Sequence, residues 1–151
     1  MTKSFNFSLQ KVLNVREMVE DTKAVELKKA QAIIDHENQK LDQTRAEKNA
    51  LLKKGSEPDT QETMSLQHLN NRTAYADQLT DKIEEQREVI EKSKQDAEEH
   101  RLAFVKASRD KMVIEKLKEH HKDAFRKKMN QEQVKVESEV AARISSKSGD
   151  A

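Results

Sequence analysis

The sequence has no cysteine, two glycines, one proline and few aromatic residues (3%). The absence of cysteine excludes disulfides, iron–sulfur clusters and thiolate zinc sites. A β-sheet protein needs turns about every 8–12 residues, and so few glycine and proline residues exclude that class. No hydrophobic run approaches the roughly 18–20 residues that span a bilayer, and the first residues lack the apolar stretch of a secretory signal.

Charge is what the sequence has in excess. Its 151 residues are 38% charged and 34% hydrophobic, against about 25% and 45–50% in an average globular domain. The hydrophobic content is too low to fill the thick core of a compact enzyme. Disorder usually accompanies a high net charge, whereas here the net charge is +1. The composition therefore predicts an all-α fold built from long helices.

Only Gly55 and Pro58 interrupt the chain strongly, because glycine ends helices and proline cannot continue one. Asp59 or Thr60 can cap a following helix, with Glu62 in its first turn. We therefore expect a single coiled-coil domain over 1–151. Its parts are helix one at about 8–53, a loop at 54–59, helix two at about 60–145 and a frayed tail at 146–151.

Apolar residues recur every seven positions in both predicted helices, which is typical of a coiled coil. In helix one the seam holds Leu9, Leu13, Leu27, Ala30, Ile34, Glu37, Leu41, Thr44, Lys48 and Leu51. In helix two it holds Leu69, Arg72, Ala76, Leu79, Ile83, Gln86, Ile90, Ser93, Ala97, His100, Phe104 and Ala107. Polar seam residues predict loose packing. After Ala107 the pattern slips, with Ile114, Leu117, His121, Phe125 and Met129 next on the stripe.

Helix length decides the predicted shape. At ~1.5 Å per residue helix one is roughly 70 Å long and helix two roughly 125–130 Å. A short connection makes the helices antiparallel and places residue 8 beside about residue 106. The prediction is a long two-helix antiparallel coiled-coil hairpin with an overhanging C-terminal helix, residues 108–145. This overhang is either a fraying helix or, as its apolar stripe favours, a surface for another protein.

Charge changes sign along the chain. Residues 1–55 carry eleven basic and eight acidic groups, residues 56–108 seven and twelve, and residues 109–147 eleven and seven. The change of sign within helix two indicates that its two ends meet different partners.

No pattern for catalysis or for metal or cofactor binding is present. There is no glycine-rich phosphate loop and no His-Glu-x-x-His sequence. His120 and His121 are adjacent, so their rings point about 100° apart on a helix. Acidic residues interrupt the basic run around Lys118, which argues against nucleic-acid binding. We therefore expect no enzyme activity, no cofactor, no metal, no nucleic acid and no small-molecule substrate.

Two segments of the chain form recognisable motifs. The first opens the chain as Phe5-x-Phe7-x-Leu9-x-x-Val12-Leu13-x-x-Arg16-Glu17. The second is Glu115-Lys116-Leu117-Lys118-Glu119 followed by Phe125, Glu132-Gln133 and Glu137. Together with the length and the two-helix layout, they resemble the FliJ family of flagellar type III export proteins. The resemblance implies a cytoplasmic coiled coil, peripherally associated with the inner-membrane flagellar basal body. It also implies a non-catalytic central stalk in the hexameric flagellar export ATPase, with the cytosolic domain of the export gate protein and export chaperones as further partners.

The sequence then predicts which residues meet these partners. The basic end should enter the ATPase ring through Phe5, Phe7, Leu117, Lys118, His121, Lys122, Phe125, Arg126 and Lys127, and Tyr75 is a second candidate contact. Alternatively, Phe5 and Phe7 pack back on Phe104 or Ala107. Two other functions stay open, a self-associating coiled-coil scaffold and an injectisome stalk protein.

Overall fold

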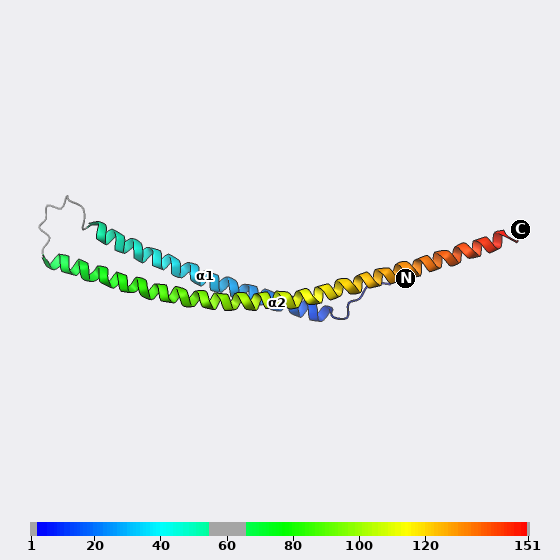
Figure 1. The fold of residues 1–151 in the computed structure, drawn as a ribbon, viewed down its shortest axis with the longest axis horizontal. Coiled ribbons are helices and arrows are strands. Elements are labelled where there is room, and N and C mark those ends of the chain that lie inside the picture. Colours follow the sequence, from blue (N-terminus) through cyan, green and yellow to red (C-terminus); the bar gives the residue numbers. More distant parts are fainter. Residues whose placement is uncertain (1–2, 55–65, 151) are drawn as a thin grey trace. The chain divides into compact units, whose positions relative to one another are not determined.

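Two long helices make up the computed structural model, which describes residues 3–54 and 66–150. Helix α1 spans Gln10–Lys54 and helix α2 spans Leu66–Ser148 (Figure 1). The all-α prediction is confirmed for the described residues, which contain no strand. Helix α1 begins two residues after the expected start, and α2 continues through Ser148, beyond the expected 145. Gly55, Pro58 and the predicted caps Asp59 and Thr60 lie outside the described residues, as does Glu62.

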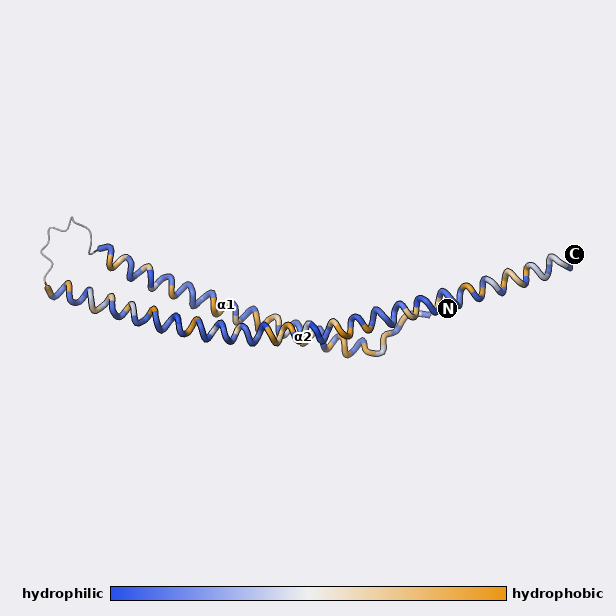
Figure 2. The backbone as a smooth tube through the Cα atoms, viewed as in Figure 1, coloured by the Kyte–Doolittle hydropathy of each residue, from blue (hydrophilic) through white to orange (hydrophobic). Residues whose placement is uncertain are grey.

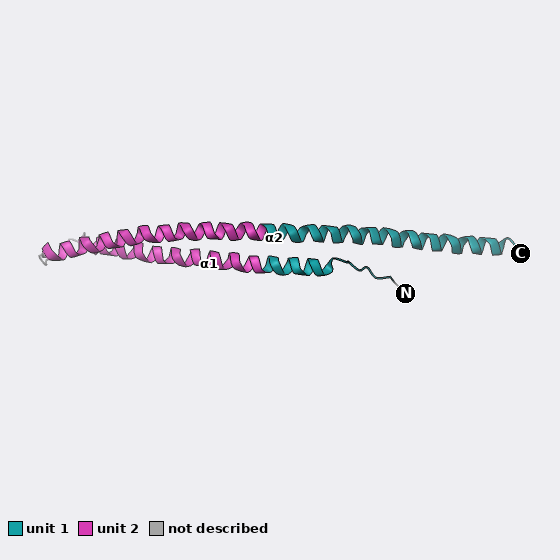
Figure 3. Ribbon diagram, turned by 90° about the horizontal axis from the view of Figure 1, so that it is seen from below, with its two compact units in different colours: residues 1–21, 106–151 teal, residues 22–105 magenta. Residues whose placement is uncertain are grey.

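The chain divides into two compact units (Figure 3). Unit 1 comprises Met1–Asp21 and Lys106–Ala151, and unit 2 comprises Thr22–Val105. Each unit contains a part of α1 and a part of α2. They are described separately below.

Unit 2 is held together by a thin apolar seam. Ala30 and Ile34 of α1 pack with Ala97 of α2, and Leu41 packs with Ile83 and Ile90. Residues further along α1 thus contact residues nearer the start of α2, so the helices are antiparallel within this unit. The predicted heptad positions Leu79, Ile83, Ile90 and Ala97 are confirmed, because all four are buried, whereas the predicted seam residue Leu69 is 51% exposed.

The seam of unit 2 is interrupted by polar residues, as the sequence predicts. Thr44 is buried, and its hydroxyl donates a hydrogen bond to the Lys40 carbonyl at 3.0 Å. Gln86, Ser93 and His100 are half-buried at seam positions of α2. Hydrophobic residues therefore appear as separated bands along both helices (Figure 2). Because each band buries little surface, we expect the pairing to be weak per turn.

In unit 1 the seam of α2 continues past Ala107. Lys111, Ile114, Lys118 and Phe125 are half-buried at the same heptad positions. Leu117 and Met129, which the predicted slip places on the stripe, are half-buried as well. Two of these positions hold lysines, so the hydrophobic pattern of the sequence ends while the seam itself continues. Each lysine finds a polar partner from the N-terminal part of the chain, as described below.

The prediction that residues 108–145 project without a partner from the same chain is wrong over much of their length. Arg16 pairs with Asp110 at 3.3 Å, and Lys118 donates a hydrogen bond to Gln10 at 2.7 Å. Residue 10 therefore lies opposite 118, whereas the sequence placed residue 8 beside about 106. The residues that precede α1 extend further along α2, because a non-helical chain covers up to ~3.3 Å per residue against ~1.5 Å in a helix. Lys3 pairs with Glu132 at 3.5 Å.

The last turns of α2 expose their apolar residues. Val134, Val136, Val140 and Ile144 are 49–64% exposed. Among the described residues, the ion pairs and hydrogen bonds between α2 and the N-terminal part of the chain extend no further than Glu132.

Candidate partner-binding site

The N-terminal segment, residues 3–9, packs two aromatic rings onto α2 within unit 1. Phe5 lies on Phe125 with ring centroids 5.7 Å apart and planes tilted by 52°. Phe7 meets His121 edge-on at 5.7 Å and 73°. Such edge-to-face and tilted pairs add roughly 0.5–1.5 kcal/mol to the burial of the rings. The alternative in which Phe5 and Phe7 pack on Phe104 or Ala107 is wrong, because both rings lie several turns further along α2.

Local backbone bonding explains how the segment reaches this place. The Gln10 amide donates a hydrogen bond to the Phe7 carbonyl at 3.1 Å, and the Leu13 amide donates one to the Leu9 carbonyl at 2.9 Å. The chain thus turns at the start of α1 and holds Phe7 against α2. Phe7 is only 5% exposed, so its main role is to fix the segment rather than to meet a partner.

Two lysines of α2 anchor the seam of unit 1 through polar contacts. Lys118 donates to the Gln10 side-chain carbonyl, and Leu117 beside it is half-buried. The Lys111 ammonium lies 3.0 Å from one Glu20 carboxylate oxygen and donates to the other at 3.2 Å. This hydrogen bond to Glu20 raises the pKa of Lys111 above its ordinary value, with nearby carboxylates adding to the shift and burial opposing it. The lysine therefore stays charged at neutral pH.

The remaining predicted cations of α2 lie on the surface. Lys122, Arg126 and Lys127 are exposed. Arg126 forms an ion pair with Asp123 one turn earlier at 3.9 Å, and such exposed pairs contribute little stability. These side chains are free to reorient toward an acidic surface. The structure thus brings Phe5, Phe7, Leu117, Lys118, His121, Lys122, Phe125, Arg126 and Lys127 together in unit 1.

Tyr75 belongs to unit 2, whereas the residues above belong to unit 1. Its hydroxyl donates a hydrogen bond to the Glu47 carboxylate of α1. This hydrogen bond raises the pKa of Tyr75, and burial and the charge of Glu47 raise it further. The side chain is 40% exposed, so the ring remains available for contact.

Sequence reasoning missed an exposed group of valines on the first turns of α1. Val12, Val15 and Val19 are 39%, 57% and 40% exposed. Their spacing of three and four residues places them on one face of the helix, beside the seam residue Leu13. Val113 of α2, also in unit 1, is 66% exposed. The sequence feature that could have revealed this group is the spacing of the three valines, which forms a second apolar stripe beside the seam positions.

Within residues 3–54 and 66–150, no group of three or more histidine and acidic residues is placed to hold a metal ion. The site combines aliphatic side chains, an aromatic segment packed on α2 and exposed cations.

A family model for the flagellar FliJ protein matches residues 5–150. The chain belongs to the FliJ family. The resemblance seen in the sequence is thereby confirmed, and membership makes this protein a component of the flagellar type III export system. Comparison with curated proteins and with solved structures found no match.

The family assignment agrees with the helical architecture of both units. In the described part of this FliJ-family chain, neither helix has a stretch apolar enough to serve as a membrane span. The candidate site residues of unit 1 come from both ends of the matched region, which extends from Phe5 to beyond Ile144.

Proposed function

We propose that this FliJ-family protein is a non-catalytic central stalk of the hexameric flagellar export ATPase. In this proposal the chain forms an antiparallel hairpin, unit 1 enters the ATPase ring, and unit 2 remains available to the export gate protein and to export chaperones. The coupling would link ATP hydrolysis in the ring to the gate. The protein itself contributes binding surfaces and no reacting groups.

One observation carries the proposal, the combination of exposed cations and exposed valines in unit 1. Lys122, Arg126 and Lys127 offer positive charge, and Val12 and Val15 offer apolar surface. Residues 109–147 as a whole carry four more basic than acidic groups. A two-helix cross-section of about 20 Å suits the inside of a protein ring, and the basic surface suits acidic pore loops.

The proposal is tested by reversing the three exposed charges. The variant Lys122→Glu/Arg126→Glu/Lys127→Glu should lose stimulation of ATP hydrolysis by the cognate export ATPase, at about 150 mM salt. Its circular dichroism should stay that of the parent, because exposed charges contribute little to helix stability. The matched control, Lys28→Glu/Lys92→Glu/Lys94→Glu, reverses three exposed lysines of unit 2. Equal stimulation by the test variant and the parent would remove the stalk assignment.

The exposed apolar residues near the end of α2 favour a second candidate, a self-associating scaffold. Val134, Val136, Val140 and Ile144 offer a surface that a second copy can cover. Sedimentation equilibrium separates the two functions. A stable dimer that dissociates on Val136→Lys/Val140→Lys supports the scaffold, whereas a monomer that stimulates the ATPase supports the stalk. The match to a flagellar family favours a flagellar over an injectisome role.

A further inference from the structure

The two sides of the seam in unit 2 differ in character. Ile33 and Glu26 on α1, and Asp96 on α2, each lie one position before a seam residue, and all three line one hollow. Another pair of such positions, Tyr75 and Glu47, is joined by a hydrogen bond between the helices. Positions preceding the seam therefore meet on one side of unit 2.

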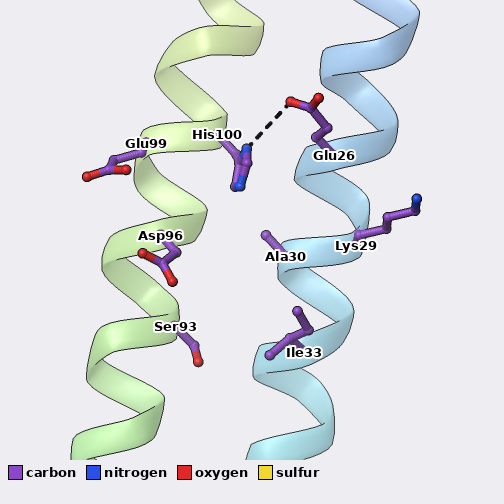
Figure 4. Close-up of a pocket in the computed structure, with 8 residues that line it drawn as sticks. All are labelled: Glu26, Lys29, Ala30, Ile33, Ser93, Asp96, Glu99 and His100. Carbon is purple, nitrogen blue, oxygen red and sulfur yellow. Dashed lines mark ion pairs between the residues drawn. The ribbon is translucent and has the colours of Figure 1, made fainter.

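Small side chains create the hollow on that side, which we name the Ala30 groove. It has a volume of about 280 Å³ and is lined by Glu26, Lys29, Ala30, Ile33, Ser93, Asp96, Glu99 and His100. Figure 4 shows Ala30 and Ile33 pointing toward α2 and Ser93 pointing toward α1. Since Ala30 and Ser93 are too short to fill the seam, an apolar floor stays open beside Ile33, which is 55% exposed.

The rim of the Ala30 groove carries a net negative charge, because three carboxylates, Glu26, Asp96 and Glu99, stand against Lys29. Glu26 is paired with Lys23 at 3.1 Å and lies 3.7 Å from His100 (Figure 4). By contrast, Asp96 and Glu99 have no ion-pair partner within 4.0 Å anywhere in the described ranges. The groove thus joins an apolar floor to two unpaired carboxylates.

The opposite side of unit 2 provides an internal comparison. A second hollow, which we name the Leu52 hollow, is lined by Arg45, Lys48, Asn49, Leu52, Thr80, Ile83, Glu84 and Arg87. It has three cations against one carboxylate, and Leu52 is 55% exposed, the same as Ile33. The two hollows therefore match in the exposure of their aliphatic residue and differ in the sign of the charge around it.

We propose that the Ala30 groove is a docking site for an amphipathic α-helix of a partner protein that carries lysine or arginine beside a large aliphatic side chain. The aliphatic side chain would lie over Ala30 and Ile33, completing a local three-helix packing. A basic side chain has an apolar stem and a charged end, which suits an apolar floor with Asp96 and Glu99 at its rim. The inference concerns unit 2 alone and does not depend on the stalk proposal for unit 1.

The chain has no cysteine, so a single introduced cysteine reports on one hollow. Full-length Lys29→Cys at the rim of the Ala30 groove and Asn49→Cys at the rim of the Leu52 hollow are each labelled with an environment-sensitive dye, and circular dichroism checks that both fold as the parent does. Two synthetic helical peptides of three heptads serve as probes. Both carry leucine on one face, and one flanks it with arginine, the other with glutamate.

We expect the arginine peptide to shift the emission of the Lys29→Cys label, at about 150 mM salt, and to leave the Asn49→Cys label unchanged. The added change Asp96→Lys/Glu99→Lys should weaken this binding by at least about tenfold, because two attractive contacts become repulsive. The inference is overturned if neither peptide binds, if the glutamate peptide binds equally well, or if both labels respond alike.

Discussion

At the scale of the residue, Phe7 shows how one aromatic side chain can place a non-helical segment. It is buried against His121, and the Phe7 carbonyl accepts a hydrogen bond from the first residue of α1. Polar contacts at Lys111 and Lys118 then extend the seam where apolar residues are missing. Sequence patterns identify apolar seam residues well, but they overlook a lysine whose partner is a glutamate or glutamine far away in the chain.

Replacing Phe7 by alanine should release the N-terminal segment. The loss of buried ring surface amounts to about 2 kcal/mol, which is large for a segment with few other contacts. Chymotrypsin should then cleave after Phe5 at least about tenfold faster, and helicity should be unchanged because residues 3–9 are not helical. The exposed neighbour provides the control, since Asn6→Ala should leave cleavage slow. Slow cleavage of the Phe7 variant would show that other contacts hold the segment.

At the scale of the element, the α1 and α2 parts of unit 2 pack through alternating apolar and polar layers. Leu79, Ile83 and Ile90 are buried around the half-buried Gln86. The heptad spacing alone predicted these positions, because seven residues correspond to two helical turns in a coiled coil. Gln86 lowers the stability of its layer, because an aliphatic side chain at this position would bury more apolar surface than the amide does.

Changing Gln86 to leucine should therefore stabilise unit 2. We expect the free energy of unfolding to rise by about 1 kcal/mol, which corresponds to the burial of one to two methylene groups. Thermal unfolding followed by circular dichroism measures the change. The matched control is Gln78→Leu at an exposed position of the same helix, for which no comparable rise is expected. Equal melting temperatures for the two variants would show that the seam is not limiting at this layer.

At the scale of the whole molecule, each of the two units depends on residues that are distant in the chain. Unit 1 joins Met1–Asp21 with Lys106–Ala151, whereas unit 2 consists of one continuous stretch. The proposed functions follow the same division. Unit 1 carries the surface that we propose for the ATPase, and unit 2 carries the Ala30 groove.

Truncation after residue 108 tests this organisation. It removes the α2 partners of Phe7, Gln10 and Arg16, so residues 10–21 should lose most of their protection from hydrogen exchange. An isolated helix of this length is marginal in water. Residues 22–54 should keep their protection, because their partners in unit 2 remain. Protection that is lost uniformly along α1, or nowhere, would contradict the division into two units.

The sequence by itself determined the helical class, the seam positions of unit 2 and the family, because charge content, the scarcity of glycine and proline and a seven-residue period are local properties. It also predicted that Phe5, Phe7 and Phe125 belong to one site. Only the tertiary structure decided where residue 10 lies along α2, since the pairing of two periodic helices can shift by whole heptads with little change in pattern. That displacement covers part of the expected overhang, buries Phe7 and leaves the valines of α1 and the Ala30 groove exposed.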